Sequence, residues 1–315
     1  MSNYPITLSS FLAVRDVEDY IEEWLNFYLI QGVQKFIIYD YASKDNTPDL
    51  IKPYMDRGIV EYSYYTEEYL EEYKHIERWF ETLSLAHRFD AIEKYKDEHK
   101  WMCFFDLDEF VFPTNEGQPD KYWDNLKTWL EKDRLYDNFP GIAINWTIFG
   151  DSGEKTKKDD YVISRFNRRA SLDYHVHDHC KVICRPCEVD LDHWRDDAFG
   201  RSAPNPHFFY YNGDNNAVNE NYCIATIPMT INETYYDFHP AFSAYPENCT
   251  TIRCNHYMVK SLEEYAEKSS RHEALRNINY AESAEQLKDY NTHEDNLIKK
   301  YIPLLKSINL DNYKI

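Results

Sequence analysis

The alternation of apolar runs and amphipathic stretches predicts strands and helices in turn along the first third of the chain. Apolar runs at residues 6–14 and 33–41 predict two strands, and the apolar residues between them recur at helical spacing after Asp16, which is expected to cap that helix. The pattern then predicts a helix ending near residue 58, a strand over 59–65, a polar helix over 66–98 and a strand over 101–112. This order is typical of a mostly parallel sheet flanked by helices, an α/β fold.

The second half is less regular. It is expected to contain strands over 141–149, 160–166, 175–186 and 251–259, followed by polar helices. No repeat or Pro/Gly/Ser-rich linker interrupts the chain. We therefore expect one main domain over residues 1–260, with residues 261–315 forming a helical extension packed on it.

Acidic side chains follow two of the predicted strands. Asp40 lies at the end of the second strand, and Asp106 and Asp108 follow the apolar residues 101–105. Because ligands of parallel sheets bind beyond the carboxyl ends of the strands, these acids are expected near a site. In an extended segment Asp106 and Asp108 would project to the same face, as paired oxygen ligands for Mg²⁺ or Mn²⁺. The ordinary alternative is an acidic turn.

The segment after Asp40 has two interpretations. Ser43, Asp45 and Asn46 are common turn residues. Asp40 and its neighbours are also able to accept hydrogen bonds from a nucleoside base or ribose.

The segment 175–187 is rich in histidine and cysteine. Cys184 and Cys187 have the spacing of zinc ligands, but no second cysteine pair follows. Cys180 and Cys184 fall on the apolar side of the predicted strand, as buried thiols do. His179 and Lys181 lie on the other side, where Lys181 is placed to contact a phosphate.

Composition and charge exclude several functions. The chain of 315 residues has a net charge of −20 and a pI near 5.0, which argues against binding to nucleic acids or anionic membranes. It lacks an apolar run long enough to span a membrane and a secretory leader. Together with an odd number of cysteines, 7, and a glycosylation sequon at Asn145 inside an apolar run, this favours a soluble, cytoplasmic protein.

Several catalytic motifs are absent. The chain has no G-x-S-x-G nucleophile elbow, no G-x-G-x-x-G dinucleotide fingerprint and no phosphate-binding P-loop. Phosphates, if bound, are therefore not held by a glycine-rich loop.

Five motifs in order resemble glycosyltransferase family 92 and the neighbouring family-2-like glycosyltransferases. They are VRDVEDYIEEWLNFYLIQGVQKFIIYDYASKDNT, WMCFFDLDEFVFP, INWTIFGDSG, HCKVICRP and NHYMVKSLEEYAEKSSR. The resemblance covers residues 8–272. It departs from the family pattern at Val14-Arg15-Asp16 and where His272 follows Arg271.

The resemblance implies a GT-A fold whose Asp-x-Asp motif holds Mn²⁺ (or Mg²⁺) against a nucleotide-sugar diphosphate. Asp108 would bind the metal directly, Asp106 through water or at a ribose hydroxyl, and His256 as a further ligand. The metal would neutralise the leaving diphosphate. The residues expected to bind the donor are Arg15, Asp40, Ser43, Asp45, Asp106, Lys181 and Lys260.

Family members that invert the anomeric carbon need a general base. Asp151 and Asp192, each after a predicted strand, are the candidates, and Trp146 and Phe149 are candidates for stacking on a sugar.

The resulting hypothesis is a metal-dependent, inverting glycosyltransferase that moves a sugar from a UDP-sugar, with UDP-galactose as first candidate, to a glycan or other hydroxyl acceptor. A nucleotidyl- or phosphoryl-transfer enzyme would need more basic phosphate ligands. A catalytically silent carbohydrate-binding protein that retains the fold is the other alternative. Eukaryotic family members are anchored in the Golgi, so a Golgi location follows if an anchor was removed.

Overall fold

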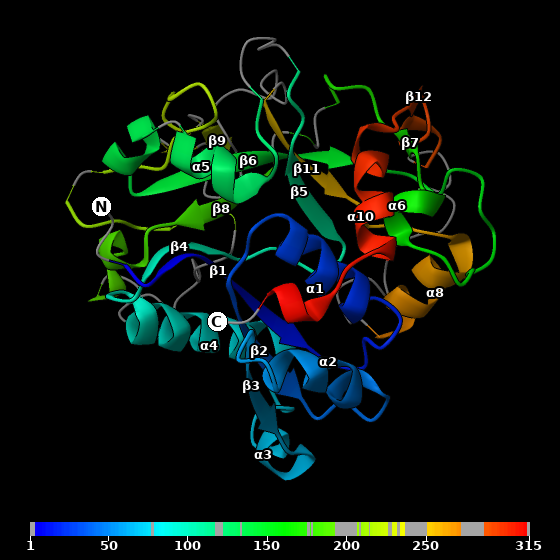
Figure 1. The fold of residues 1–315 in the computed structure, drawn as a ribbon, viewed down its shortest axis with the longest axis horizontal. Helices are drawn as coiled ribbons and strands as arrows, with labels where there is room; N and C mark the ends of the chain where they lie inside the picture. Colours follow the sequence, from blue (N-terminus) through cyan, green and yellow to red (C-terminus); the bar gives the residue numbers. More distant parts are fainter. Residues whose placement is uncertain are drawn as a thin grey trace.

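The computed structural model describes residues 4–313 except 77–78, 117–121, 133, 175–176, 178, 193–206, 208, 214, 226–228, 232–233, 237–250 and 272–286. Its centre is an eight-stranded sheet with the order β3-β2-β1-β4-β8-β6-β11-β5 (Figure 1). The strands are β1 (Ile6–Val14), β2 (Lys35–Tyr41), β3 (Val60–Tyr65), β4 (His99–Cys103), β5 (Glu109–Pro113), β6 (Gly141–Ile148), β8 (Cys180–Cys184) and β11 (Ile252–His256).

The sheet is mixed and mostly parallel, which confirms the predicted α/β class. Strands β3, β2, β1 and β4 are parallel neighbours, as are β6 and β11. Strand β8 is antiparallel to both β4 and β6, and β5 is antiparallel to β11. The carboxyl ends of β1, β2 and β4 therefore meet at one edge, where Val14 pairs with Asp40.

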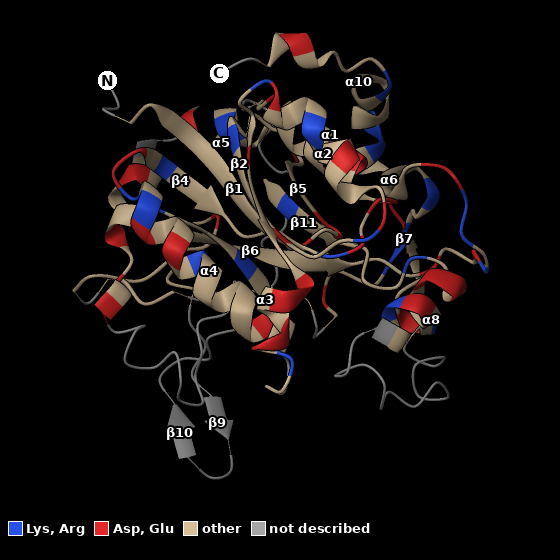
Figure 2. Ribbon diagram, turned by 90° about the horizontal axis from the view of Figure 1, so that it is seen from below, with Lys and Arg blue, Asp and Glu red and all other residues tan. Residues whose placement is uncertain are grey.

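Helices cover both faces of the sheet. They are α1 (Ile21–Ile30), α2 (Thr47–Met55), α3 (Glu67–Glu71), α4 (Trp79–Tyr95), α5 (Leu126–Lys132), α6 (Val162–Arg165), α8 (Leu262–Arg271) and α10 (Ile302–Lys306). Figure 2 shows α4 on one side of β1 and β2, with α1 and α2 on the other. Successive β1 residues accordingly enter different cores, Phe11 beside α4 and Leu12 beside α1.

Shorter elements complete the chain. Two small antiparallel pairs join β7 (Arg168–Arg169) to β12 (His293–Glu294) and β9 (Met229–Ile231) to β10 (Thr234–Tyr236). The 3-10 helices are η1 (Arg134–Asn138), η3 (Pro186–Glu188), η5 (Leu297–Tyr301) and η6 (Leu310–Asn312). In the C-terminal part, Tyr301 packs edge-on against Phe27 of α1 at 5.5 Å. The proposed boundary at residue 260 stays a prediction.

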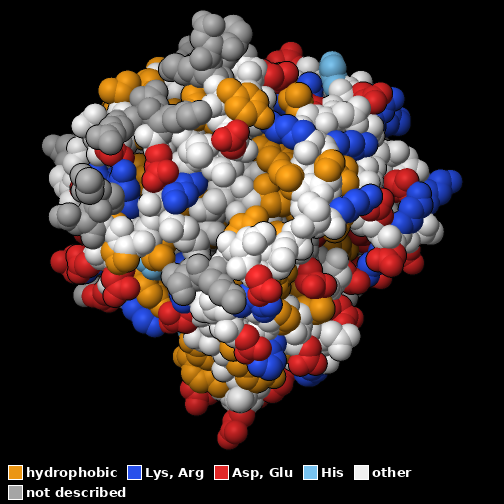
Figure 3. Space-filling view, viewed as in Figure 1, with side chains coloured by type: hydrophobic (Ala, Val, Ile, Leu, Met, Phe, Trp, Pro, Cys, Tyr) orange, Lys and Arg blue, Asp and Glu red, His pale blue; other side chains and the backbone are white. Residues whose placement is uncertain are grey.

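The surface carries charges of both signs. Figure 3 shows them interspersed over the face seen in Figure 1, with acidic side chains gathered at the lower end, where α3 lies. No helix in the described part of the chain combines the length and apolarity that a membrane crossing requires.

The predicted strand over 101–112 is wrong, because it is divided in two. β4 ends at Cys103 and β5 begins at Glu109, and the Asp-x-Asp residues form the turn between them. The carboxylate of Glu109 accepts a hydrogen bond from the backbone N–H of Asp106 at 2.9 Å, which closes the turn. β5 then pairs with β11 instead of continuing beside β1. Both halves have strand-forming residues, so local preference did not reveal the break.

The predicted cap of the first helix is also wrong. Helix α1 begins at Ile21, after an N-cap at Tyr20 that makes no side-chain capping bond. Asp16 instead has a left-handed backbone, with φ of 51°. Its N–H donates to Ser43 Oγ at 2.9 Å and its carboxylate accepts from the N–H of Lys44 at 2.7 Å. Asp16 therefore joins β1 to the loop after β2.

Two further elements differ from expectation. The predicted helix over 66–98 is two helices. The first, α3, begins at Glu67 after an N-cap at Thr66, whose hydroxyl accepts from the N–H of Tyr69. The predicted strand over 160–166 contains α6. The first N–H groups of that helix, on Val162 and Ile163, donate to the buried carboxylate of Glu23. A partner from α1 thus decides a conformation that the β-branched residues do not favour.

The strand predicted over 175–186 is shorter in the described residues. β8 begins at Cys180, and residues 175, 176 and 178 lie outside the description. His177 is buried and its Nε2 accepts the N–H of Ile148 at 2.9 Å. Asn145 is buried and donates to the carbonyl of His177 at 2.8 Å, which leaves no room for a glycan.

Candidate active site at the Asp-x-Asp turn

The Asp-x-Asp turn lies at the carboxyl end of β4, beside the ends of β1 and β2. Trp24 of α1 holds it, because its indole Nε1–H donates to the carbonyl of Asp106 at 3.0 Å. The side chain of Asp106 is 52% exposed, whereas that of Asp108 is only 10% exposed. The two carboxylates therefore face different surroundings and have different partners.

Lys181 of β8 is the partner of Asp106. Its Nζ lies 2.6 Å from Asp106 Oδ2 and 3.3 Å from Glu109 Oε2. Burial disfavours the charged ammonium, but Asp106 and Glu109 outweigh that effect and raise the pKa of Lys181. Lys181 thus faces the Asp-x-Asp turn, and its contact with a phosphate stays a prediction. Strand β8 lies between β4 and β6 in the sheet, and its Lys181 pairs with Ile144 of β6. This position in the sheet places Lys181 beside the turn that follows β4.

Asp108 contacts Lys268 of α8 and His256 of β11. The distance from Lys268 Nζ to Asp108 Oδ2 is 2.5 Å, and that from His256 Nε2 to Asp108 Oδ1 is 3.5 Å. Burial opposes ionisation of Asp108, but these two neighbours outweigh it and hold its pKa well below the usual value. His256 reaches the turn because it stands opposite Glu109 in the β11–β5 ladder.

Some buried polar atoms around the turn have no hydrogen-bond partner among the described residues. They are Glu109 Oε1, His256 Nδ1 and Trp146 Nε1. The ring of Trp146 lies 4.4 Å from that of His256 and stacks on His179 at 5.1 Å. Unsatisfied buried groups are costly, so atoms of this kind beside a charged turn point to a ligand that completes them.

The two aromatic candidates for sugar contact lie in different surroundings. Trp146 is partly exposed beside the histidines, next to the acidic turn. Phe149 is completely buried and packs 4.7 Å from Tyr257, so its place is in the core.

Two of the three predicted metal ligands are paired with lysines in this arrangement. Asp106 and Asp108 each contact a lysine ammonium group, and ammonium groups exclude a divalent cation from the same oxygens. Among the described residues, no three His, Cys, Asp or Glu side chains are grouped so as to hold a metal ion. The same holds for the zinc alternative at Cys184, whose thiol is buried. The assignment of Asp106, Asp108 and His256 as metal ligands stays a prediction.

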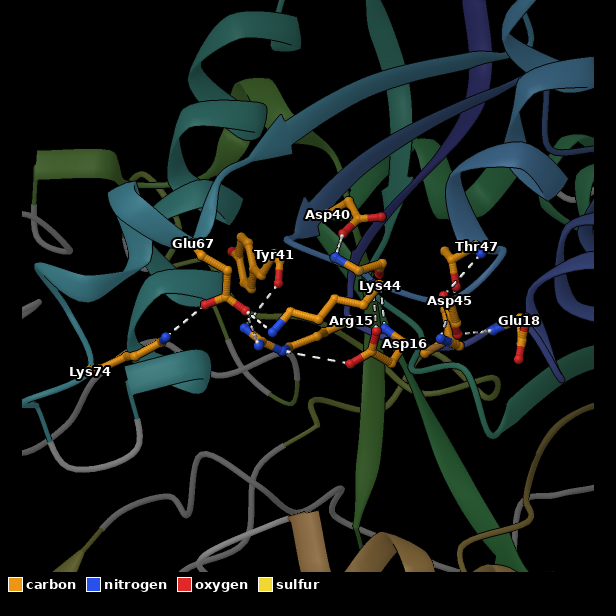
Figure 4. Close-up of polar contacts among 12 residues, drawn as sticks. Arg15, Asp16, Glu18, Asp40, Tyr41, Lys44, Asp45, Thr47, Glu67 and Lys74 are labelled. Atoms are coloured by element: carbon orange, nitrogen blue, oxygen red, sulfur yellow. Dashed lines mark hydrogen bonds and ion pairs between the residues drawn. The ribbon is translucent and has the colours of Figure 1, made fainter.

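The loop after β2 is organised by its own side chains (Figure 4). Asp40 is fully buried, and its carboxylate accepts from the N–H of Ser43 at 2.8 Å and from Tyr62 Oη at 2.7 Å. Burial raises the pKa of Asp40 despite these hydrogen bonds. Asp45 accepts from the N–H groups of Glu18 and Thr47. These acids thus shape the loop, and a nucleoside contact from Asp40 or Asp45 stays a prediction.

Arg15 belongs to a basic cluster on the same edge (Figure 4). Its guanidinium donates to the carbonyl of Tyr41 and to Glu67 Oε1, the latter at 2.7 Å. Lys44 and Lys74 also reach Glu67, at 2.9 and 2.7 Å. Hydrogen bonds from Lys74 and Lys44 lower the pKa of Glu67 to about 2. Three cations around one partly exposed carboxylate place positive charge where the resemblance expects the donor.

Lys260 lies close to the acidic turn. Its backbone is left-handed, with φ of 57°, and its Nζ lies 4.4 Å from the ring centroid of Tyr20. Burial lowers the pKa of Lys260 to about 8, although Asp108 acts in the opposite direction.

The two general-base candidates stay predictions. Asp151 accepts hydrogen bonds from the N–H of Gly153 and from Asn291 Nδ2, the latter at 2.9 Å. Asp192 is exposed at the end of a described segment.

Sequence reasoning missed the residues that position α8. Arg165 binds Glu264 through both terminal nitrogens, at 3.1 and 2.6 Å, and Tyr20 Oη donates to the same carboxylate at 2.8 Å. Lys268 follows Glu264 by one helical turn. The Glu264/Lys268 spacing was a visible signal for one shared helix face, but the partners of that face were not visible.

Comparisons with known proteins agree with the resemblance. The chain is 26% identical over 135 residues to a glycosyltransferase family 92 protein of Arabidopsis thaliana, which covers 42% of this chain and 21% of that protein. It is 27% identical over 138 residues to a family 92 protein of Ricinus communis, with the same coverage of 42% and 21%. The aligned part thus spans about a fifth of these curated relatives.

The solved structures that resemble the chain include S. aureus TarS 1–349 in complex with UDP. The TM-score is 0.35 at 15% identity, covering 57% of this chain and 47% of that chain. For the TarS complex with UDP-GlcNAc, the TM-score is 0.32 at 14% identity, with coverage of 57% and 46%. The sequence evidence is more direct. The model of glycosyltransferase family 92 matches residues 12–193, more than half of the 315 residues, and the chain therefore belongs to that family.

Proposed function

We propose that this chain transfers a sugar from a nucleoside diphosphate sugar to a hydroxyl group of a glycan or other acceptor. Besides membership of the family, one observation supports this most strongly. Asp106 and Asp108 stand at the carboxyl edge of the sheet, each in contact with a lysine, beside buried polar atoms without partners. Lysines grouped at this edge are able to bind an anionic substrate, and the carboxylates beside them are able to accept hydrogen bonds from its hydroxyl groups.

The chemistry requires positive charge near the leaving diphosphate. When the bond between the anomeric carbon and the diphosphate oxygen breaks, negative charge grows on that oxygen. Lys181, Lys260 and Lys268 are cations beside the Asp-x-Asp turn that we propose stabilise it. Asp106 or Asp108 would then accept hydrogen bonds from ribose or sugar hydroxyls.

For inversion, the acceptor oxygen attacks the anomeric carbon from the face opposite the diphosphate. A carboxylate takes the proton of the acceptor hydroxyl as the new bond forms. Asp151 and Asp192 remain the candidates for this role, and UDP-galactose remains the first candidate donor. The cation that the resemblance implies does not fit carboxylates already paired with lysines, so no step is assigned to a metal ion.

The nucleoside would lie by the loop after β2. Arg15, Asp40, Ser43 and Asp45 shape that loop, and Lys44 and Arg15 give it positive charge. A cytoplasmic location stays part of the proposal; among the described residues, cysteines 103, 180, 184, 187, 223 and 254 form no disulfide bond.

The test is release of nucleoside diphosphate from a panel of UDP- and GDP-sugars, in buffer that contains Mn²⁺ so that metal is not limiting. We expect turnover of one donor and a loss of about 100-fold or more in Asp108→Asn, because the site loses a charged contact. Asp56→Asn, which alters an exposed pair with Lys52, is the matched control. Equal turnover in both variants would contradict the assigned site. No turnover and no binding of any donor would favour a silent binding protein.

A further inference from the structure

The contact between Lys268 and Asp108 is built into the fold. Glu264 and Lys268 lie one turn apart in α8 and on the same side of the helix. The Arg165 and Glu264 side chains are 4% and 2% exposed, and they form a two-bond ion pair. This anchor fixes α8 against α6 and directs Lys268 at the acidic turn.

Other contacts strengthen the anchor. Ser261 Oγ donates to Glu264 Oε2 at 2.5 Å, and Tyr20 Oη donates to Glu264 Oε1 at 2.8 Å. Lys268 Nζ also lies 3.5 Å from the carbonyl of Met258, in addition to 2.5 Å from Asp108. The ammonium group is thus held between the carboxylate and a backbone oxygen, in the way a cation is held by oxygen ligands.

The charges around the turn balance without a metal ion. The carboxylates are those of Asp106, Asp108 and Glu109, and the lysines that act on them are Lys181, Lys260 and Lys268. A divalent cation site needs carboxylates whose charge is left over for the metal. Here, Lys181 contacts both Asp106 and Glu109, and Lys268 and Lys260 both act on Asp108, so three lysines face three carboxylates.

The match to the family model does not show whether the site holds a metal ion. The family model matches residues 12–193, so it includes Asp106 and Asp108 but none of His256, Lys260 and Lys268. The residues that would either complete a metal site or take the place of the metal therefore lie beyond the matched part of the chain.

We propose that Lys268 takes the place of the divalent cation beside Asp108, so that the chain binds its nucleoside diphosphate donor through lysine ammonium groups and without a metal. This rests on the proposed function. Lys268, with Lys181 and Lys260, donates charge-assisted hydrogen bonds to the diphosphate in the bound donor and in the leaving group. No proton is transferred by the lysines, and the electron pair of the broken bond stays on the diphosphate oxygen.

The first measurement is Mn²⁺ binding to the full chain without donor, by calorimetry and by the loss of the free Mn²⁺ paramagnetic resonance signal. We expect no binding at Mn²⁺ concentrations up to about 1 mM, which means that the dissociation constant for Mn²⁺ exceeds about 1 mM. Lys268→Met frees Asp108 and His256, and it should gain Mn²⁺ binding. Lys268→Arg keeps the charge and should not. Tight Mn²⁺ binding by the unmodified chain would overturn the proposal.

The second measurement is the affinity for UDP and GDP by calorimetry, in EDTA and again in Mn²⁺. We expect the better nucleotide to bind the unmodified chain equally in both buffers. In EDTA, Lys268→Met should weaken that binding about tenfold or more, because a charge-assisted contact is lost. Lys306→Met, an exposed lysine of α10, should leave it unchanged.

The outcomes separate the two proposals. Nucleotide binding that appears only with Mn²⁺ overturns the role of Lys268 and leaves the glycosyltransferase intact. Absence of nucleotide binding in every buffer overturns the proposed function, and the Mn²⁺ measurement then still decides what Lys268 does. Neither result depends on the stability of Lys268→Met, because the unmodified chain is measured in both buffers.

Discussion

Lys181 and Glu109 are both completely shielded from solvent, and the Lys181 ammonium nitrogen lies 3.3 Å from Glu109 Oε2. The same ammonium group reaches Asp106 at 2.6 Å. One lysine of β8 therefore connects the Asp-x-Asp turn to the first residue of β5. Burial raises the pKa of Glu109, with Lys181 opposing it, so the carboxylate depends on this contact to remain charged.

Removal of that lysine should destabilise the fold. We expect Lys181→Met to reduce the free energy of unfolding by about 3–5 kcal/mol, because it leaves buried carboxylate charge without a partner. Lys52→Met removes an exposed pair with Asp56 and should cost less than about 1 kcal/mol. Urea unfolding followed by circular dichroism measures both. If Glu109→Gln in the Lys181→Met background recovers nothing, the pair is not the cause.

The anchor of α8 gives a second prediction. Arg165→Met should reduce the free energy of unfolding by about 3–5 kcal/mol, because Glu264 stays buried with its charge uncompensated. It should also weaken nucleotide binding, since α8 carries Lys268. Arg57→Met, whose partner Asp311 is 60% exposed, is the control and should change neither quantity appreciably. Full nucleotide affinity in folded Arg165→Met would show that α8 is positioned by other contacts.

The contribution of Glu23 to the free energy of unfolding should fall as the pH rises. Burial raises its pKa to about 7, against hydrogen bonds from Val162 and Ile163 that oppose the shift. A raised folded pKa contributes stability that is fully present below the unfolded value of 4.5 and is lost as the pH rises through 7. The contribution is about 3 kcal/mol.

Urea unfolding of Glu23→Gln and the unmodified chain at pH 5 and pH 8 tests this. The variant should lose stability relative to the unmodified chain at pH 5 and less, or none, at pH 8. A difference that does not change with pH would mean that Glu23 does not titrate in this range.

His87 should give the opposite dependence of the unfolding free energy on pH. It is stacked between Tyr39 and Tyr65, at 4.6 and 4.5 Å, and burial lowers its pKa to about 4. A lowered folded pKa means that stability is present above the unfolded value of 6.5 and is lost as the pH falls toward 4. His87→Phe should lessen the decline in unfolding free energy between pH 6.5 and 4.5. An unchanged slope would place the acid sensitivity elsewhere, for instance at His99, whose pKa burial also lowers.

The apolar pattern determined β1 and β2, because strands buried on both faces need continuous runs of apolar residues. The range predicted for β1, 6–14, is the one observed, and the acids of the second and fourth predicted strands do lie at one sheet edge. The motif resemblance was sufficient to identify the family, which the match to residues 12–193 confirms.

The failures concern contacts between distant parts of the chain. The segment 101–112 has strand-forming residues on both sides of the turn, and only the pairing of β5 with β11 decides that it breaks. Residues 162–165 form a helix because Glu23, far away in the sequence, accepts the N–H groups of Val162 and Ile163.

The partners of the acidic pair were likewise a matter of tertiary structure. Lys268 and Asp108 are 160 residues apart, and their contact depends on the Arg165–Glu264 anchor and on the antiparallel ladder that places His256 beside the turn. Periodicity shows which side of a helix or strand is buried, but it carries no information about the element packed against that side. The sequence by itself therefore determined that two carboxylates stand at the carboxyl edge of the sheet, which is the edge where parallel sheets generally bind ligands. Only the fold decided that lysines neutralise them, because long-range packing sets which charges meet.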